Sequence, residues 1–552
     1  MYSDKENINI LTALLLAHGV RHAVVCPGSR NAPITHNLCE AREMTCVSVT
    51  DERSAAFVAL GKAQALGEPV VVCVTSGSAL VNTLPAVVEA WYQHVPIIVV
   101  SADRPAAMIG QLQGQTMPQQ KTLEAFWAKE VSLPEPHDDV ERWYCNRLVN
   151  EALCAMKQYG GGPVHVNVPI SEPLFNFTTA ELPTERRVSL MDNHLWPSEL
   201  TEEFLVSSRP MLVVGQLQCT VARRVSGAIR RLEKSVVVLS EQLATCGNAP
   251  CHFDEALIGI GEQEAYKPDY IIYIGDTLVS KRAKHFLQHC HPKSCVVVNA
   301  SGELTDVTMN VTDVVVCPVE DALDSLCEKL ESGDVALGNE ASAFRGRWAM
   351  ALDKWAIRCK VFEPAYSQMM AVRRLCEQTN GQECHMQFAN SSAVRLGQLY
   401  SSHHLYVNRG VNGIEGSLST AVGFASEKDV TVYCVIGDLS FFYDQNALWN
   451  GVGKRHLRMV VLNNGGGGIF HQLRGLEQSP YRDSFVSATH TASAKGVCEA
   501  TGVAYKAASN EEELVEGISW ITRGQATGPL LLEVFTNAEI DAREYKKYLE
   551  TK

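Results

Sequence analysis

Residues 431–468, TVYCVIGDLSFFYDQNALWNGVGKRHLRMVVLNNGGGG, decide the fold class of this chain. They contain two short apolar runs, 431–436 and 457–462, which lack the alternation of half-buried strands and are too short for buried helices. Both runs are therefore predicted to be fully buried strands of a parallel sheet. The residues between them, 440–453, suffice for one crossover helix. A right-handed βαβ unit would then bring the ends of both strands to one edge of the sheet.

Polar side chains follow each of these two strands. Asp438 comes after the first strand and Asn464 after the second, so we expect the two to lie side by side. Their carboxylate and amide oxygens are hard ligands of the kind that Mg²⁺ prefers and shares with phosphates. The glycine run 465–468 lets the backbone come close, and we assign the carbonyl of Gly466 as a further ligand. The alternative interpretation is a helix-capping aspartate followed by a glycine-rich turn.

Composition limits the class of protein. The chain has 552 residues, enough for about three domains, and its 46% hydrophobic and 20% charged residues are typical of globular proteins with large cores. The formal charge of −14 and the lack of a basic tract argue against nucleic acid and anionic membrane surfaces. No apolar stretch is long enough to span a membrane, and residues 1–6 do not resemble a signal peptide. The 18 cysteines lie mostly within apolar runs, so we expect free, buried thiols and a cytoplasmic location.

Apolar strands alternate with helical patterns in each part of the chain. This pattern predicts an α/β fold of three domains with doubly wound parallel sheets, at residues 1–181, 198–330 and 345–552. Linkers are expected at 182–197 and 331–342. No Gly-x-Gly-x-x-Gly motif opens the second domain, so a flavin or nicotinamide site has no support there. No sequence repeat relates the first and third domains.

The second domain contains a group of histidines and cysteines that could form a second metal site. His285 and His289 could share one helix face, with Cys290, His291 and Cys295 nearby, which is a possible zinc-ligand set. No second paired motif completes it, however, and Cys295 opens an apolar strand. The sequence therefore disfavours metal binding at this position.

Short motifs lie at strand ends and turns along nearly the whole chain. They are Pro27-Gly28-Ser29-Arg30, Asp51-Glu52-Arg53, Thr75-Ser76-Gly77 with Asn82, Ala102-Asp103-Arg104-Pro105, Lys281-Arg282, Asn390-Ser391 with Arg395, Asn408-Arg409-Gly410 with Gly413-Ile414, Gly437-Asp438-Leu439-Ser440, and Asn463-Asn464 with Ile469-Phe470. Together they resemble the MenD family of thiamine diphosphate enzymes, the 2-succinyl-5-enolpyruvyl-6-hydroxy-3-cyclohexene-1-carboxylate synthases of menaquinone biosynthesis. Two positions depart from the pattern: Leu439 stands where most thiamine diphosphate enzymes have glycine, and Gly114 where some members have asparagine before Gln115.

The resemblance implies a cofactor, a reaction and an assembly. The domains would be pyrimidine-binding, central and diphosphate-binding, and thiamine diphosphate with Mg²⁺ (or Mn²⁺) would lie between the first domain of one subunit and the third domain of another. A homodimer is then the minimum unit, and a tetramer is possible. The enzyme, a transferase, would decarboxylate 2-oxoglutarate and add the resulting succinyl-semialdehyde carbanion to isochorismate.

The resemblance also implies roles for individual residues. Glu52 would hydrogen-bond the aminopyrimidine ring, and Ile414 would hold the cofactor in its bent conformation. The implied cofactor-binding set is Glu52, Ser391, Arg409, Ile414, Gly437, Asp438, Leu439, Ser440, Asn464, Ile469 and Phe470, with Asp438, Asn464 and Gly466 as metal ligands. The implied substrate-binding set is Ser29, Arg30, Arg104, Gln115, Lys281, Arg282, Arg395 and Leu473, of which Arg30, Gln115 and Arg395 join Glu52 in catalysis.

The basic residues support this assignment on physical grounds. Each implied substrate carries two carboxylates, so an acidic protein needs a local positive cleft to bind them. Basic residues lie in or beside the motifs at Arg30, Arg104, Lys281, Arg282, Arg395 and Arg409. Individually, such a residue is more often a surface charge or part of a structural ion pair. As a set they favour a dicarboxylate site over the smaller substrates of acetolactate-synthase or decarboxylase-type lyases.

A related protein that binds the cofactor without catalysis is the other alternative, and intact Glu52, Asp438 and Asn464 argue against it.

Overall fold

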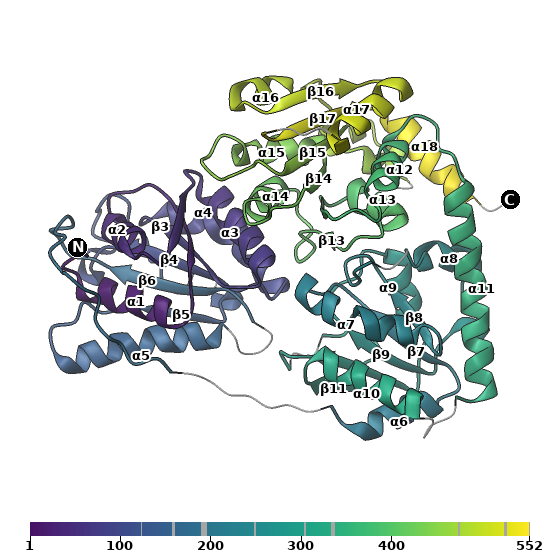
Figure 1. The fold of residues 1–552 in the computed structure, drawn as a ribbon, viewed down its shortest axis with the longest axis horizontal. Coiled ribbons are helices and arrows are strands. Elements are labelled where there is room, and N and C mark those ends of the chain that lie inside the picture. Colours follow the sequence, from purple (N-terminus) through teal and green to yellow (C-terminus); the bar gives the residue numbers. More distant parts are fainter. Residues whose placement is uncertain are drawn as a thin grey trace. The chain divides into compact units, whose positions relative to one another are not determined.

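The structure is a computed structural model and describes residues 1–122, 124–156, 161–188, 196–247, 250–302, 305–332, 337–472, 475–523 and 527–550. Three parallel sheets with flanking helices make up these residues, which confirms the predicted α/β class (Figure 1). The strands of each sheet lie within one of the three predicted domain ranges, while the domain boundaries themselves stay a prediction. Among the described helices, none is long and apolar enough to cross a bilayer.

The first sheet has six strands in the order β2-β1-β3-β4-β6-β5. Its strands are β1 (His22–Val25), β2 (Thr45–Ser48), β3 (Val70–Val74), β4 (Ile97–Asp103), β5 (Lys129–Ser132) and β6 (Val164–Pro169). Its helices are α1 (Glu6–Ala17), α2 (Ala32–Glu40), α3 (Glu52–Leu66), α4 (Ser78–Tyr92) and α5 (Asp139–Ala155), with short 3-10 turns η1 (Ala106–Met108) and η2 (Glu124–Phe126). Strands β3 and β4 are buried along their whole length, as expected for apolar runs without alternation.

The second sheet has five strands in the order β11-β10-β9-β7-β8. They are β7 (Pro210–Val214), β8 (Val237–Ser240), β9 (Tyr270–Ile274), β10 (Ser294–Asn299) and β11 (Asp313–Val316). The helices are α6 (Ser198–Val206), α7 (Cys219–Leu232), α8 (Phe253–Ile260), α9 (Lys281–Gln288) and α10 (Val319–Ser332), with η3 (Glu264–Tyr266). A long helix, α11 (Asn339–Val361), then leads toward the third sheet, so the predicted linker 331–342 overlaps the ends of two helices.

The third sheet has six strands in the order β13-β12-β14-β15-β17-β16. They are β12 (His385–Phe388), β13 (Leu405–Tyr406), β14 (Val432–Gly437), β15 (Leu457–Asn463), β16 (Ala504–Ala508) and β17 (Leu530–Phe535). The helices are α12 (Gln368–Thr379), α13 (Ser392–Tyr400), α14 (Ser417–Ala425), α15 (Asp438–Tyr443), α16 (Lys495–Thr501), α17 (Glu511–Arg523) and α18 (Ala538–Leu549). Short turns of other helix types are η4 (Gln445–Ala447), η5 (Gly468–Gln472), η6 (Leu476–Gln478) and η7 (Arg482–Val486).

The pair of strands predicted from residues 431–468 is confirmed. Strands β14 and β15 are neighbours in the third sheet and are almost wholly buried. The crossover differs from the prediction, because its helix begins at Asp438 and ends at Tyr443, after only six residues. Asp444, which follows, turns its buried carboxylate to the first turn of α14 and accepts hydrogen bonds from Ser419 N (2.6 Å) and Ser419 Oγ (2.7 Å).

The chain forms two compact units. The first comprises Met1–Asp192 with Gly410–Asp429 and Tyr443–Leu457, and the second comprises Asn193–Arg409 with Val430–Phe442 and Arg458–Lys552. Helix α14, which the sequence assigned to the third domain, thus packs within the first unit, beside α3 (Figure 1).

Glycines make this helix crossing very close. A Cβ atom on Gly61 of α3 would lie 2.0 Å from Thr420 O, and one on Gly423 of α14 would lie 2.1 Å from Val58 O. The two backbones therefore touch at positions where no other residue type fits without displacement.

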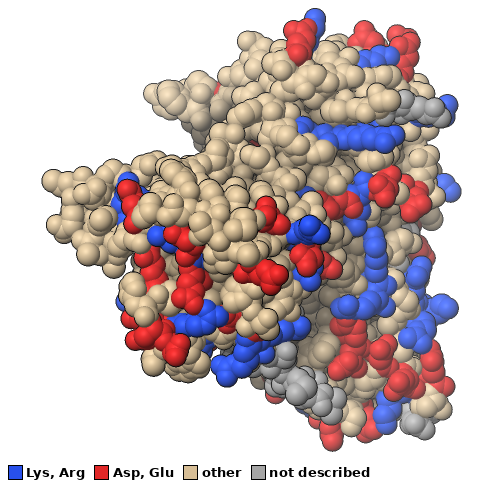
Figure 2. Space-filling view, turned by 60° about the vertical axis from the view of Figure 1, so that its left-hand side comes forward, with Lys and Arg blue, Asp and Glu red and all other residues tan. Residues whose placement is uncertain are grey.

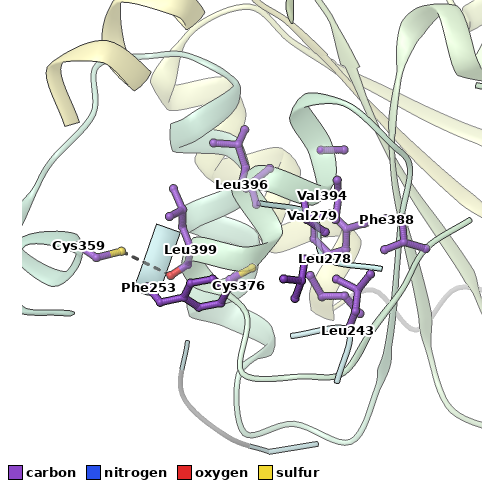
Figure 3. Close-up of a cluster of buried hydrophobic side chains, with 14 of the residues drawn as sticks. Leu243, Phe253, Leu278, Val279, Cys359, Cys376, Phe388, Val394, Leu396 and Leu399 are labelled. Carbon is purple, nitrogen blue, oxygen red and sulfur yellow. Dashed lines mark hydrogen bonds between the residues drawn. The ribbon is translucent and has the colours of Figure 1, made fainter. Parts of the chain in front are cut away.

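Within the second unit, the second and third sheets share one hydrophobic core. Leu243, Leu278 and Val279 from the second sheet lie in the same cluster as Phe388 and Leu399 from the third (Figure 3). All 18 cysteines are free thiols, most of them buried, as predicted. On the surface, basic and acidic side chains are interspersed over the face shown in Figure 2.

Candidate functional site

The carboxylate of Asp438 meets the glycine run that follows β15. Asp438 is the first residue of α15 and is only 3% exposed. Its Oδ2 accepts a hydrogen bond from Gly466 N (3.0 Å), and its Oδ1 accepts one from Leu439 N (2.7 Å). Burial raises the pKa of this carboxyl, and these backbone N–H groups oppose the shift. The structure thus brings the two strand-end segments into contact, as the βαβ argument predicted.

The side chain of Asn464 is oriented by a residue that the sequence analysis did not identify. Its Nδ2 donates to Asp541 Oδ2 (3.0 Å), on α18, and Thr536 Oγ1 donates to the same oxygen (2.8 Å). Because the amide nitrogen is held by Asp541, its oxygen Oδ1 is the atom left to accept a ligand. A Cβ atom on Gly468 would lie 2.2 Å from Asn464 Nδ2, so this approach needs glycine.

These donors fit a hard divalent cation. The set consists of a carboxylate, an amide oxygen and a backbone carbonyl, all oxygen ligands of the kind Mg²⁺ takes. Gly466 has φ +153°, and a Cβ atom there would lie 2.7 Å from Ser487 O, so the loop conformation also depends on glycine. The carbonyl of Gly466 accepts one hydrogen bond, from Gly468 N (2.9 Å), and a carbonyl oxygen has a second lone pair.

Two helices begin at this edge of the third sheet. Helix α13 starts directly after Ser391 and follows β12, while α15 starts at Asp438 and follows the neighbouring β14. Ser391 has φ +72°, a left-handed conformation that is strained for a residue with a side chain. Nothing lies within 4 Å of where a Cβ atom on Gly437 would be, so there is room beside the strand end. Free N–H groups of helix N-termini favour phosphate oxygens, which is the chemistry a diphosphate needs.

The other residues of the second unit that the sequence predicts to bind the cofactor lie in the segments around this edge. Arg409 Nη1 donates to Asn390 Oδ1 (3.2 Å), and Asn390 Nδ2 donates to Asn408 O (2.6 Å), which ties two of the predicted motifs together. Ser440 is buried in α15, next to the Leu439 position, whose backbone N–H contacts Asp438. Ile469 and Phe470 lie half-buried in η5, and Leu473 lies outside the described residues.

Arg395 of α13 lines two adjacent cavities in the second unit. One also contains Asn464, Gly468, Asp541 and Tyr545. The other contains Glu241, Asp254, Ser280 and Tyr545. Arg395 therefore lies between the edge of the third sheet that carries Asn464 and the loops that follow the strands of the second sheet.

The second cavity also connects with the Lys281-Arg282 motif. Both residues are exposed at the start of α9, and the Arg282 guanidinium forms an ion pair with Asp254. Ser280 Oγ donates to the same carboxylate. Arg282, which was predicted to bind substrate, is thus paired with Asp254, a residue that no sequence pattern marked.

In the first unit, Glu52 is the first residue of α3, after the N-cap Asp51, whose side chain accepts from Ser54 N (3.0 Å). Glu52 Oε2 accepts a hydrogen bond from Asn82 Nδ2 (3.1 Å), on α4. Ile414, in the same unit, is 44% exposed, as are other single apolar side chains of the described surface. Its exposure leaves it accessible to a ligand but does not by itself indicate one.

Arg30 has structural partners. It is only 6% exposed, its Nη1 donates to Ile170 O (3.0 Å), and its Nη2 pairs with Glu172 Oε1 (3.1 Å). Ser29, next to it, is exposed. The guanidinium thus binds protein groups of its own unit, so Arg30 contributes to the fold.

Arg104 organises the loop that carries Gln115. Its Nε and Nη2 both donate to Gly114 O (3.1 and 2.9 Å). Gln115 is exposed, with φ +55°. Position 114 contributes only its backbone carbonyl to this contact, and nothing lies within 4 Å of where a Cβ atom would be, so the contact does not depend on the side chain at this position.

The structure adds a buried carboxylate that sequence reasoning missed. Glu89 of α4 is 3% exposed and accepts from Gly410 N (2.8 Å) and Val411 N (2.9 Å), in the motif that leads to Ile414. Burial raises the pKa of its carboxyl. Its only signal in the sequence is an isolated glutamate within an apolar helix pattern.

The His285 to Cys295 group does not form a metal site among the described residues. His285 and His289 stack on each other at 4.2 Å, and Cys290 is buried with its Sγ donating to Phe286 O (3.1 Å). A different group, Cys219, Cys246 and His404, does bring potential ligand atoms together.

Comparison with known families agrees with this geometry. Residues 8–124 match the family described as thiamine pyrophosphate enzyme, N-terminal TPP binding domain, and residues 389–534 match the corresponding C-terminal TPP binding domain. These segments contain strands of the first and third sheets. The fold and the matches define the class: this is a thiamine diphosphate enzyme.

Full-length relatives identify the family. The chain is 42% identical to the 2-succinyl-5-enolpyruvyl-6-hydroxy-3-cyclohexene-1-carboxylate synthase of Bacteroides thetaiotaomicron, with 99% of each chain covered. It is 35% identical to the synthase of the same name from Desulfotalea psychrophila, over 97% of this chain and 98% of the relative. The chain belongs to the 2-succinyl-5-enolpyruvyl-6-hydroxy-3-cyclohexene-1-carboxylate synthase family.

Proposed function

We propose that this protein decarboxylates 2-oxoglutarate and transfers the remaining four-carbon unit to isochorismate, using thiamine diphosphate and Mg²⁺ (or Mn²⁺). The observation that carries the proposal is the contact between Asp438 Oδ2 and Gly466 N (3.0 Å), at the edge where α13 and α15 begin. When bound there, the cofactor supplies a carbanion equivalent at its thiazolium ring.

The third domain holds the charged end of the cofactor. Asp438, Asn464 Oδ1 and the Gly466 carbonyl bind the metal ion, because they are the hard oxygen ligands of this edge. The N–H groups that begin α13 and α15, with Ser391, Arg409 and residues 437–440, bind the diphosphate. Ile469 and Phe470 form an apolar wall that limits access of water, with Leu473 assigned the same role from the sequence.

The first domain acts on the other end of the cofactor. Glu52 holds a proton at its carboxyl and binds the aminopyrimidine ring, and Asn82 orients this carboxyl through its 3.1 Å hydrogen bond. Ile414 supports the bent cofactor conformation. Glu52 and Asp438 belong to different units of the chain. We propose that the first domain of one subunit and the third domain of another complete each site in a homodimer or larger assembly, in the cytoplasm.

Basic and polar side chains bind the substrate carboxylates. Arg395 is the leading candidate, since it lines the cavities that adjoin Asn464 and Asp254. Lys281 and Arg282 lie at the start of α9, and a substrate carboxylate would replace Asp254 as the partner of Arg282. Ser29, Arg30, Arg104 and Gln115 contribute from the first domain, with Arg104 holding the Gln115 loop through Gly114.

A direct assay tests the proposal. The purified protein is incubated with 2-oxoglutarate, isochorismate, thiamine diphosphate and Mg²⁺, and the product is identified by its mass. We expect formation of the adduct and release of CO₂ that depends on 2-oxoglutarate. Release of CO₂ from pyruvate instead would point to a general 2-oxo-acid lyase. Binding of the cofactor with no turnover of either acid would point to a protein that has lost catalysis.

A further inference from the structure

Two cysteines and a histidine gather at a second place in the second unit. Cys219 is the first residue of α7, Cys246 lies in the loop after β8, and His404 directly precedes β13. One potential ligand atom from each residue lies within 4.8 Å of the other two. None of the three belongs to a motif of the proposed active site, and they are far apart in the sequence.

The histidine is buried and incompletely bonded. His404 is 8% exposed, and its Nδ1 is buried with no hydrogen-bond partner. A buried ring nitrogen without a partner is costly to maintain, so it points to a ligand that supplies one. Tyr406 packs edge-on against the same ring, with centroids 4.8 Å apart.

Both cysteines are shielded from solvent. Cys219 is 8% exposed and Cys246 is half-buried. Their side chains form a hydrogen bond with each other, and Tyr406 and Arg223 lie beside Cys219. The thiolate is the form of cysteine that binds metals, so metal binding releases the thiol protons.

We propose that Cys219, Cys246 and His404 bind a zinc ion at a site separate from the metal edge beside Asp438. Two sulfur ligands and one imidazole suit Zn²⁺ and exclude Mg²⁺, which takes oxygen ligands. Three protein ligands leave a fourth position of the tetrahedron, which a water molecule fills. Binding displaces the thiol protons to solvent, so affinity rises with pH.

The position of the site gives it a structural role. Cys219 and Cys246 belong to the second sheet's layer, and His404 belongs to the third, where Leu405 N already donates to Gln242 O (2.8 Å). A bound ion would cross-link the two layers a few residues before Asn408 and Arg409. It would therefore fix the start of a cofactor-binding motif without touching the reacting groups.

Cobalt titration provides the first test. The full-length reduced protein is treated with a chelator, saturated with thiamine diphosphate and Mg²⁺ to occupy the oxygen site, and titrated with Co²⁺. We expect one equivalent to produce the absorption of cobalt–thiolate bonds and Zn²⁺ to displace it. Cys219→Ser and Cys246→Ser should each abolish this absorption. Cys384→Ser is the matched control, since Cys384 Sγ lies 3.6 Å from His403 Nε2 and so forms a cysteine–histidine pair outside the proposed site.

A second measurement uses only the wild-type protein, so it does not depend on folding of the variants. Zn²⁺ at ten times its dissociation constant should slow alkylation of Cys219 and Cys246 by about tenfold, and leave Cys384 unchanged. Absence of the cobalt–thiolate absorption from the wild type, or its persistence in both serine variants, would overturn the proposal. Unchanged alkylation rates of Cys219 and Cys246 would also overturn it.

Discussion

The first and third sheets share one strand order and differ in what stands at their strand ends. Numbered within each sheet along the chain, both read 2-1-3-4-6-5. In the first sheet, polar groups at the strand ends bond to each other: Gln119 Nε2 donates to Asn167 Oδ1 (2.7 Å), and Gly77 N donates to Gln119 Oε1 (2.7 Å). In the third sheet, glycines and helix N-termini stand at the corresponding edge.

The difference shows how one scaffold carries two tasks. The first sheet closes its strand ends with a buried network and presents Glu52 from a helix that follows an edge strand, β2. At the strand ends of the third sheet, by contrast, we propose that a diphosphate and a metal ion bind. Fold alone therefore does not determine function, because the strand-end side chains do.

The largest effect is expected from substituting Glu52, the residue of the first domain that we propose to act in catalysis. Glu52→Gln keeps the shape of the side chain but cannot hold the catalytic proton, so kcat should fall by about 10²–10⁴-fold, with cofactor affinity little changed. Steady-state kinetics and calorimetric titration measure the two quantities. Glu68→Gln, at an exposed position, is the control. A kcat close to that of the wild type would remove Glu52 from the mechanism.

The third sheet is tested at Asp438. Asp438→Asn removes the only carboxylate assigned to the metal, so affinity for Mg²⁺ and for thiamine diphosphate should fall together, on the order of 100-fold. Calorimetric titration of each ligand in the presence of the other checks this. Asp429→Asn, in the exposed turn before β14, should leave both affinities unchanged. Loss of affinity for only one ligand would contradict the shared site.

The crossing of α3 and α14 tests whether helices from both domains form one folding unit. Gly61→Ala places a Cβ atom against Thr420 O, so stability should fall by about 3 kcal/mol as the two helices are forced apart. Gly346→Ala is the control, because nothing lies within 4 Å of that Cβ position in α11, and it should stabilise by up to about 1 kcal/mol. Denaturant midpoints of both variants measure the difference. Equal midpoints would show that the helices do not depend on this contact.

Arg30 and Arg395 follow the first strand of their respective sheets and should behave differently. Arg395→Ala should raise KM for one substrate by about 10- to 100-fold with little change in stability, since Arg395 lines a cavity. Arg30→Ala should also lower the melting temperature, because it removes the partner of Glu172 and of the Ile170 carbonyl. Lysine at position 395 should rescue only in part. Kinetics and thermal unfolding of the same samples compare them, and wild-type KM values in both variants would refute the dicarboxylate site.

The smallest effect expected is a pH dependence of stability at Asp444. Burial raises the pKa of this carboxyl from 3.8 to about 6, so the fold favours its protonated form. Its stabilising contribution is complete below the unfolded value and is lost as pH rises through about 6. The stability of the wild type relative to Asp444→Asn should therefore fall by roughly 1–3 kcal/mol between pH 4 and pH 6.5. Denaturant unfolding across this range measures it, and a flat difference, as expected for Asp429→Asn, would contradict the shift.

Sequence reasoning predicted the parts of the site that depend on local order along the chain. The contact between Asp438 and Gly466 follows from two buried strands and one crossover. The orientation of Asn464 by Asp541 could not be predicted, because the partner lies on α18, the last helix, and no pattern marks it. The ion pair of Arg282 with Asp254 is equally non-local.

The shared strand order of the two sheets was also invisible in the sequence. Burial requires the strands to be apolar, but many different apolar residues meet this requirement. Two sheets with the same strand order therefore need not have similar sequences. The packing of α14 in the first unit depends on Gly61 and Gly423, which look like unfavourable helix residues until the opposite backbone is seen.

The interleaved units have a consequence for dissecting this protein. The chain passes from one unit to the other near residue 192 and again at 409/410, 429/430, 442/443 and 457/458. A gene fragment ending near residue 192 would encode the whole first sheet but would lack α14, leaving the surface of α3 around Val58 and Gly61 exposed to water. Separating the second sheet from the third would expose the hydrophobic core that they share, part of which is drawn in Figure 3. The three sheets are thus not three exchangeable modules, and a functional transplant would have to carry the inserted helices with the sheet that they cover.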